Sequence, residues 1–262
     1  MLIDTHCHLD AAEFDADRLD EARAARAAGV RAIVIPAVAV DNFDHVRRLA
    51  HQVDGAYALG IHPLFVERSA PEDLVALRHL VEQSIDDPRL VAIGEIGLDH
   101  FIAGSDRERQ MLFYREQLKI ARDHDLPVLL HVRRAQDPVL AQLRRFGVRQ
   151  GIAHAFNGSR QQADAYLGQG FALGFGGAMT FGRALQIRRL AAELPDGAHV
   201  LETDAPDIAP AWQPRERNSP TQLPRIAQVF ADLRETTPDA VARRTGENAL
   251  RVLPRLGGLL RP

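Results

Sequence analysis

Leu2-Ile3-Asp4-Thr5-His6-Cys7-His8 is the segment that decides the fold, because an apolar, strand-like run ends directly in two histidines. A doubly wound open sheet would place a glycine-rich phosphate loop after its first strand. Imidazoles stand there instead, which favours a closed barrel that carries metal ligands at the carboxyl ends of its strands. Residues i and i+2 of a strand share a face, so His6 and His8 should point into the barrel mouth and Cys7 into the surrounding wall.

Other apolar runs along the chain also end in histidine or in an acidic residue. They end at His62, Glu95, His131, His154 and Asp204. Taken singly, a hydrogen-bonded core histidine is as ordinary as a metal ligand. The carboxyl ends of parallel barrel strands meet at one rim, and this shared position favours the metal-binding interpretation.

Strand-like and helix-like runs alternate along all 262 residues, which is typical of βα units around a parallel sheet. We expect strands at 2–8, 31–38, 56–62, 91–95, 127–132, 151–154, 171–176 and 200–204. We expect helices at 15–28, 42–52, 69–84, 106–123, 137–146, 159–169, 183–193, 221–235 and 238–253. No linker or charge block divides the chain, and (β/α)8 barrels typically have about 250 residues. The sequence therefore predicts an α/β protein with one domain, 1–262, folded as a single TIM barrel.

Composition limits the cellular setting. Hydrophobic residues make up 46% of the chain, as expected of a protein with a well-buried core. The single cysteine, Cys7, excludes an intramolecular disulfide and fits a reducing compartment. The chain starts without an export signal, and no apolar run is long enough to span a membrane. We expect a cytoplasmic protein with no membrane association and no evident obligate protein partner.

The charge of the chain argues against tight nonspecific binding of nucleic acid. The net charge is −3, so no overall positive field attracts a polyanion. Every basic residue except Lys119 is an arginine. That bias suits phosphate recognition, but an arginine-rich codon usage explains it more simply, since most of these arginines lie on predicted helix surfaces.

The ligand-type side chains are too numerous for one tetrahedral zinc ion and suit two adjacent divalent ions. The candidate metal ligands are His6, His8, Glu95, His131, His154 and Asp204. Gly94 and Gly97 leave room around Glu95 for a bridging carboxylate, although an ion pair with a rim arginine is the alternative. Lys119 lies in the predicted helix 106–123, so a carboxylated lysine cannot serve as the bridge. Four imidazoles favour Zn²⁺, whereas the carboxylates favour Mg²⁺ or Mn²⁺.

Asp204 and Glu95 are the candidate catalytic residues. Asp204 ends the last predicted strand, where it could bind one ion and take a proton from a water molecule. Glu202 shares its inward face but lies deeper, so it should orient a ligand instead of binding metal. A buried acid paired with an arginine is an equally good interpretation of Glu202.

Two rim residues are candidates for binding substrate. His62 and Arg133 face the same mouth and are surplus to metal coordination, so each could contact an anionic group of the substrate. A rim hydrogen bond or salt bridge is the alternative for both. Asp99 and Asn157 are weaker candidates at the rim. Trp212 could stack on a base, although packing within its loop is the simpler role.

These residues resemble the sequence blocks of the TatD family of metal-dependent deoxyribonucleases, in order and in spacing, over about the whole chain. The blocks are Asp4-Thr5-His6-Cys7-His8-Leu9, Gly60-Ile61-His62-Pro63, Gly94-Glu95-Ile96-Gly97-Leu98-Asp99, Leu130-His131, His154-Ala155-Phe156-Asn157-Gly158 and Glu202-Thr203-Asp204-Ala205-Pro206. Two further stretches look most like the family's YjjV-type branch, namely Gly176-Gly177-Ala178-Met179-Thr180 and Arg133-Arg134-Ala135.

The resemblance implies a site with two metal ions. One ion would take His6, His8 and Asp204, the other His131 and His154, and Glu95 would lie between them. It also implies a 3′–5′ exonuclease dependent on Mg²⁺ or Mn²⁺, while other relatives are linked to removal of D-amino acids from tRNA. Two departures beside the metals put substrate choice in doubt: His131-Val132-Arg133 replaces the usual His-Ser-Arg, and Asn157 replaces the usual serine or threonine.

We therefore expect a binuclear, metal-dependent hydrolase of ester bonds. The leading hypothesis is a 3′–5′ deoxyribonuclease that cleaves phosphodiesters with a hydroxide held between the ions, with DNA as a weakly bound substrate. A hydrolase of another ester, such as a D-aminoacyl-tRNA or a phosphomonoester, is the alternative. A non-catalytic scaffold that binds metal is the third hypothesis, disfavoured because every ligand position is filled.

Overall fold

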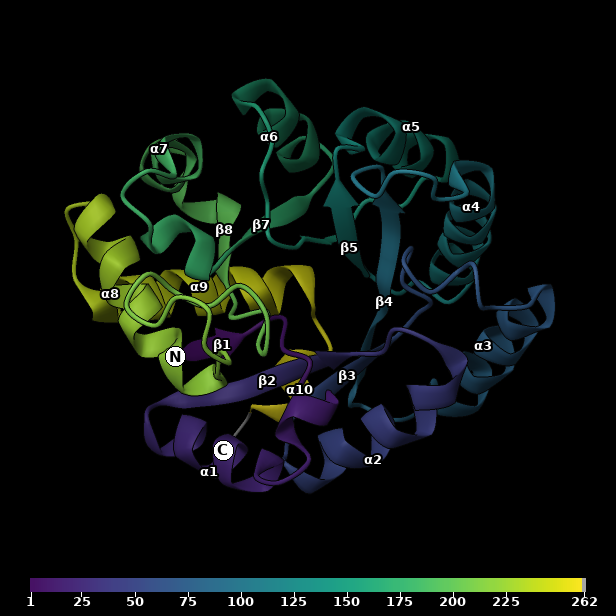
Figure 1. Cartoon of the computed structure of the whole chain (residues 1–262), viewed down its shortest axis with the longest axis horizontal. Coiled ribbons are helices and arrows are strands. Elements are labelled where there is room, and N and C mark those ends of the chain that lie inside the picture. The colour runs from purple at the N-terminus through teal and green to yellow at the C-terminus, as the bar shows by residue number, and fades with distance from the viewer. Residues whose placement is uncertain (261–262) are drawn as a thin grey trace.

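The computed structural model describes residues 1–260, so the last two residues of the expected domain 1–262 lie outside the described residues. Eight parallel strands in this range form one sheet in the order β1 to β8, and helices surround them (Figure 1). The sheet closes between β8 and β1, where the Thr5 N–H donates to the Leu201 carbonyl (3.1 Å) and the Asp204 N–H to that of His6 (2.9 Å). The predicted (β/α)8 TIM barrel is confirmed.

Most residues of the strands are buried, as expected where helices cover a parallel sheet from outside. Their bounds are β1 (Leu2–Asp4), β2 (Val30–Pro36), β3 (Ala56–Leu59), β4 (Leu90–Asp99), β5 (Val128–Arg133), β6 (Gly151–Ala153), β7 (Phe171–Phe175) and β8 (His199–Leu201).

Each predicted helix is present, with bounds that differ by a few residues. The helices are α1 (Arg18–Ala27), α2 (Phe43–Gln52), α3 (Pro71–Ser84), α4 (Arg107–Asp123), α5 (Gln136–Phe146), α6 (Arg160–Leu167), α7 (Leu185–Glu193), α8 (Leu223–Leu233), α9 (Pro238–Val252) and the short, unpredicted α10 (Leu256–Leu259). Side-chain caps fix several starts: Asp106 accepts from the N–H of Arg109 before α4, and Thr237 from that of Ala240 before α9. None of the helices within residues 1–260 has the length and apolar content needed to cross a bilayer.

The barrel interior is apolar at the end that lies away from the predicted ligands. Ile3, Val34 and Leu129 belong to a buried cluster that also contains Val252 and Leu256 from the C-terminal helices. These helices therefore close the end of the barrel where the strands begin. The polar side chains are left for the opposite end, where parallel-barrel enzymes carry their sites.

Several predicted strand ends are wrong in a consistent way. β1 ends at Asp4, β3 at Leu59 and β8 at Leu201, so the candidate ligands in these segments follow the ladders instead of ending them. The chain stays extended beyond β1, because the Cys7 N–H still donates to the carbonyl of Val34 (3.1 Å). An apolar run thus continues into the mouth after regular pairing has stopped.

The strand that contains Glu95 is longer than predicted, so Glu95 lies inside β4 and not at its end. The pairing of β4 with β5 shifts register between Ile93 and Ile96, and the strand then continues to Asp99. An irregularity of this kind can re-aim a side chain. Gly97 follows with a φ of 148°, and its missing Cβ lets the strand approach the backbone of His131.

Candidate metal centre

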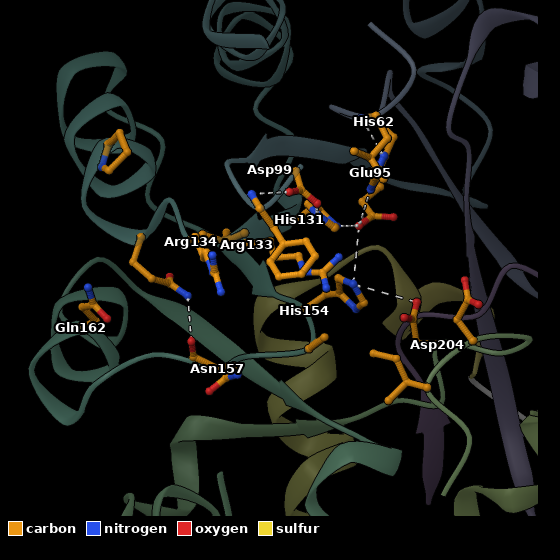
Figure 2. Close-up of a pocket in the computed structure, with 18 of the residues that line it drawn as sticks. His62, Glu95, Asp99, His131, Arg133, Arg134, His154, Asn157, Gln162 and Asp204 are labelled. Atoms are coloured by element: carbon orange, nitrogen blue, oxygen red, sulfur yellow. Dashed lines mark hydrogen bonds and ion pairs between the residues drawn. The ribbon is translucent and has the colours of Figure 1, made fainter. Parts of the chain in front are cut away.

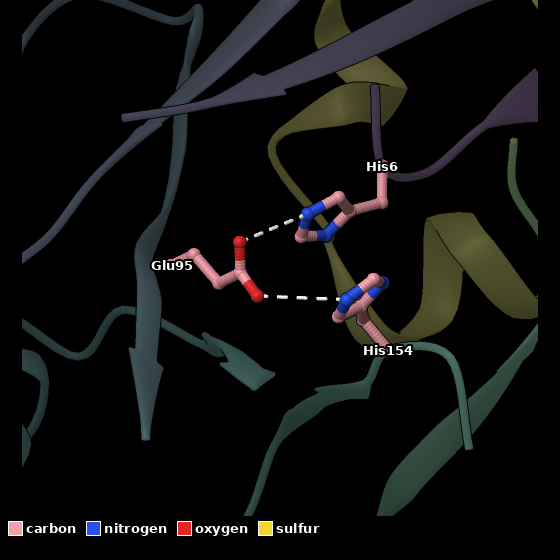
Figure 3. Close-up of side chains that lie close together, drawn as sticks. All are labelled: His6, Glu95 and His154. Carbon is pink, nitrogen blue, oxygen red and sulfur yellow. Dashed lines mark hydrogen bonds and ion pairs between the residues drawn. The ribbon is translucent and has the colours of Figure 1, made fainter. Parts of the chain in front are cut away.

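All the predicted metal ligands come together at the mouth of the barrel, around Glu95. Figures 2 and 3 label Glu95 together with His6, His131, His154 and Asp204. Glu95 Oε2 lies 3.2 Å from His6 Nε2 and 3.3 Å from His8 Nε2. Its other oxygen, Oε1, lies 3.0 Å from His131 Nδ1 and 3.5 Å from His154 Nε2. The two oxygens of one carboxylate thus face different imidazoles.

Asp204 closes the site from the β8 side. Its Oδ1 lies 3.6 Å from His6 Nε2, 3.8 Å from His8 Nε2 and 3.9 Å from His154 Nε2. Ligand atoms about 2.1 Å from one ion are separated by roughly 3.0–3.4 Å in octahedral or tetrahedral geometry. The separations found here are close to those values, so the donor set fits divalent cations.

The charges of the site also fit a cation. Burial would raise the pKa of Glu95, but His62, His6 and His154 hold it well below its usual range. Against the effect of burial, neighbouring carboxylates raise the pKa of His8 to about 9 and that of His154 to about 10. His8 and His154 would therefore carry protons near neutral pH when no metal is bound, and bound metal ions would replace these protons.

A buried carboxylate contacts the second ring nitrogen of two of the histidines. Glu202 Oε1 lies 3.2 Å from His154 Nδ1, and Asp99 Oδ2 lies 3.1 Å from His131 Nε2 (Figure 2). Such contacts fix ring orientation and raise ligand basicity. They leave His154 Nε2 and His131 Nδ1 directed at Glu95. Gly174 makes room for Glu202, because a Cβ there would clash with its carboxylate.

His62 lies closer to the ligands than a rim position would suggest. Its Nε2 is 3.5 Å from Glu95 Oε1, and its ring centroid is 4.3 Å from that of His131. Burial lowers the pKa of His62 to about 4, so the ring is neutral near pH 7. Its Nδ1 accepts a hydrogen bond from the Leu64 N–H (3.1 Å), which puts the ring proton on Nε2. His62 Nε2 is thus a hydrogen-bond donor in the mouth.

A cavity of about 990 Å³ lies over these residues and includes Arg133 and Asn157 in its wall (Figure 2). Trp212 is absent from the wall. Its Nε1 donates to Gln222 Oε1 (2.9 Å), and Arg225 lies over its ring at 4.1 Å. The structure therefore places Trp212 in loop packing.

Comparison with known protein families also indicates a metal-dependent hydrolase. The family model described as "TatD related DNase" matches residues 3–254. The chain belongs to the TatD family. A similar family member is "Uncharacterized metal-dependent hydrolase YjjV" from Escherichia coli (strain K12), with 39% identity over 243 residues, 92% of this chain and 93% of the relative. "Uncharacterized metal-dependent hydrolase YabD" from Bacillus subtilis (strain 168) is 32% identical over 255 residues, 96% of this chain and 98% of the relative.

The fold of this TatD-family protein also matches that of a solved relative. The crystal structure of YjjV from Escherichia coli K12, described as a TatD homolog, superposes with a TM-score of 0.92 at 38% identity, covering 97% of this chain and 98% of that chain. The protein is accordingly a metal-dependent hydrolase.

Sequence reasoning left two contacts of this TatD-family protein unpredicted. Asp99 was only a weak rim candidate, although it ends β4 and its partner in the ladder is Arg133, two residues from His131. The position of Phe101 beneath two arginine side chains was not foreseen at all. Both contacts depend on the β4–β5 register, which no local pattern encodes.

Proposed function

We propose that this TatD-family hydrolase uses two divalent metal ions to cleave phosphodiesters, as a 3′–5′ deoxyribonuclease. The observation that carries the proposal is the position of Glu95, whose two oxygens face different imidazoles: Oε2 faces His6 and His8, and Oε1 faces His131, His154 and His62. A carboxylate in this position can bridge two adjacent ions. Enzymes that displace a group at phosphorus commonly use two such ions. The description of the matching family as a DNase supports the choice of substrate.

The proposed ligands divide into two groups that share Glu95. His6, His8 and Asp204 would hold one ion, and His131 and His154 the other. When bound, the ions would polarise the phosphoryl oxygens and lower the pKa of a water molecule, so that hydroxide is available as the nucleophile at neutral pH. The mixed set of imidazole and carboxylate donors suits Mg²⁺, Mn²⁺ or Zn²⁺.

The chain's own residues would move the proton and hold the substrate. Asp204, whose Oδ1 lies 3.6 Å from His6 Nε2, would stand beside the water molecule at the ions and could accept its proton. His62 would donate its Nε2 proton to a substrate oxygen. Arg133 would bind an anionic group of the substrate, and Glu202 would hold the ring of His154.

Hydrolysis of another ester, such as a D-aminoacyl-tRNA or a phosphomonoester, is the second candidate. The observation that favours it is the acidic character of the protein: the net charge is −3, and Asp137 and Asp207 lie in the cavity wall. These charges oppose tight binding of a long polyanion. DNA would accordingly be a weakly bound substrate.

A substrate comparison tests the proposal. Purified protein loaded with Mg²⁺, Mn²⁺ or Zn²⁺ would be incubated with 5′-labelled single-stranded DNA, 4-nitrophenyl phosphate and D-aminoacyl-tRNA, with Glu95→Gln as the inactive control. We expect stepwise shortening of the labelled strand, and protection of a strand whose 3′-terminal linkages are phosphorothioates. Cleavage of the aminoacyl ester or the phosphomonoester, without DNA cleavage under any metal, would overturn the proposal.

A further inference from the structure

Two adjacent arginines, Arg133 and Arg134, lie in the cavity wall (Figure 2). Among the described residues neither guanidinium forms an ion pair or a hydrogen bond, and both instead lie over Phe101. The guanidinium carbon is 3.7 Å from the ring centroid for Arg133 and 4.7 Å for Arg134. Two guanidinium cations over the same ring repel each other, and the electron-rich face of an aromatic ring offsets part of that repulsion.

The strands bring these three side chains together. Arg133 ends β5 opposite Asp99 of β4, and the His100 N–H donates to the Arg133 carbonyl (2.8 Å). The Phe101 N–H donates to Asp99 Oδ1 (2.8 Å), which fixes the start of the loop that carries the ring. Arg134 then has a φ of 55°, a left-handed conformation that is uncommon outside glycine, where the chain turns towards α5.

Some arginines elsewhere in the described residues contact carboxylates, as Arg160 does with Asp164 and Arg217 with Asp17. What sets the pair in the cavity wall apart is its place: both side chains line the cavity beside the metal centre, and neither guanidinium has a hydrogen-bond partner among the described residues. A guanidinium presents several donors in a planar fork that matches the oxygens of phosphate. The pair is therefore suited to bind an anion that the protein itself does not supply.

The surroundings indicate what else such a ligand would carry. Phe101 is 43% exposed and Leu64, also in the cavity wall, is 46% exposed. Exposed apolar side chains beside free arginines suit a ligand with both flat apolar and anionic parts, as in single-stranded nucleic acid. The cavity volume of about 990 Å³ is at the upper end for ligand sites, so one phosphate at the metal centre would leave most of it unfilled.

We propose that Arg133 and Arg134, held over Phe101, form an outer anion subsite that binds a second phosphate of the substrate, next to the one that is cleaved. The inference rests on the proposed function and deepens it by naming the substrate class. The substrate is a strand with at least two phosphates, and a small phosphomonoester or an isolated diester leaves the subsite empty.

Kinetics on two diesters test the subsite. Bis(4-nitrophenyl) phosphate has one phosphate, whereas an oligothymidylate has several. Arg134→Asn removes the charge, and asparagine tolerates the left-handed backbone at this position. The variant should lose about tenfold in kcat/KM on the oligothymidylate, as expected for one charge-assisted contact at an open site. On bis(4-nitrophenyl) phosphate it should stay within about twofold of the wild type.

Arg145→Asn is the matched control. It removes the same charge from the far end of α5, where the guanidinium also lies near a phenylalanine ring, Phe146, at 5.7 Å. The control should keep wild-type kinetics on both substrates. Equal losses on the two diesters in Arg134→Asn, or no loss on the oligothymidylate, would overturn the subsite.

Binding gives a second readout that needs no turnover. Fluorescence anisotropy of a labelled oligothymidylate, measured in an Asp204→Asn background over a range of salt, reports the number of phosphate contacts. Adding Arg134→Asn should lower the slope of log K against log salt by about 0.7, the value for one contact to a single strand. An unchanged slope contradicts the subsite. If the wild type cleaves neither diester but the slope still falls, the subsite stands and the proposed function is wrong.

Discussion

Replacing Asp204 with asparagine separates the two roles that its position allows, holding an ion and accepting a proton. Asp204 has a φ of 57°, and asparagine is one of the few residues that tolerate this left-handed conformation, so the backbone should be unchanged. The amide oxygen can still face His6 Nε2 and His8 Nε2, from which Asp204 Oδ1 lies 3.6 and 3.8 Å. An amide cannot take up a proton at neutral pH.

The expected loss follows from the environment of this carboxylate. Its side chain is only 13% exposed, so bulk water gives little help in removing the proton. We expect kcat to fall by a factor on the order of 10² to 10⁴, the range found when a general base is removed. That loss corresponds to roughly 3–5 kcal/mol of activation free energy, at about 1.4 kcal/mol for each factor of ten.

The assay is steady-state kinetics at saturating metal, with metal content measured on the same samples. Asp164→Asn is the control, because Asp164 is an exposed acid on α6 that pairs with Arg160. It should behave as the wild type. A near-normal kcat in Asp204→Asn with full metal content would refute the proton-transfer role and leave Asp204 as a ligand at most.

Three further predictions concern the residues that support the site and the barrel. Glu202→Gln should weaken metal retention by roughly 10–100-fold, because Glu202 Oε1 lies 3.2 Å from His154 Nδ1; titration with a chelator measures this, and unchanged retention would deny Glu202 that role. Gly174→Ala should cost about 1–3 kcal/mol of stability, because the added Cβ would clash with the Glu202 carboxylate; a wild-type melting transition would show that the carboxylate can move aside. Burial, together with Arg234, lowers the pKa of His199 to about 3, below its value of 6.5 in an unfolded chain. The unfolded state therefore binds more protons between these values, and stability should fall as the pH drops through this window, less steeply in His199→Gln. Urea unfolding over that pH range checks the slopes, and equal slopes would contradict the assignment.

The barrel and the meeting of the ligands were predictable because both follow from local pattern. Apolar runs that end in histidine or acid place those side chains at one rim once the strands are parallel, whatever the details of pairing. Strand ends were less predictable, because hydrogen bonds to neighbouring strands set them. Asp204 therefore lies beyond β8, and Glu95 lies inside β4. The roles assigned to these residues stay predictions.

Contacts between residues on different strands could not be predicted from the sequence. Asp99 contacts His131 only because of the β4–β5 register, and Glu202 has room beside His154 only because Gly174 lacks a side chain. The same register places Phe101 under Arg133. In each case residues far apart in the sequence must first be brought together before the chemistry of the contact can be recognised.

A metal-loaded crystal structure with anomalous scattering data tests the central claim most directly. We expect two ions roughly 3.5–4 Å apart, as in other two-metal hydrolytic sites. The two oxygens of Glu95 should bind different ions. The first ion should also bind His6, His8 and Asp204, and the second should also bind His131 and His154. A single ion at full occupancy, or a Glu95 carboxylate directed away from the mouth of the barrel, would contradict the proposed binuclear centre.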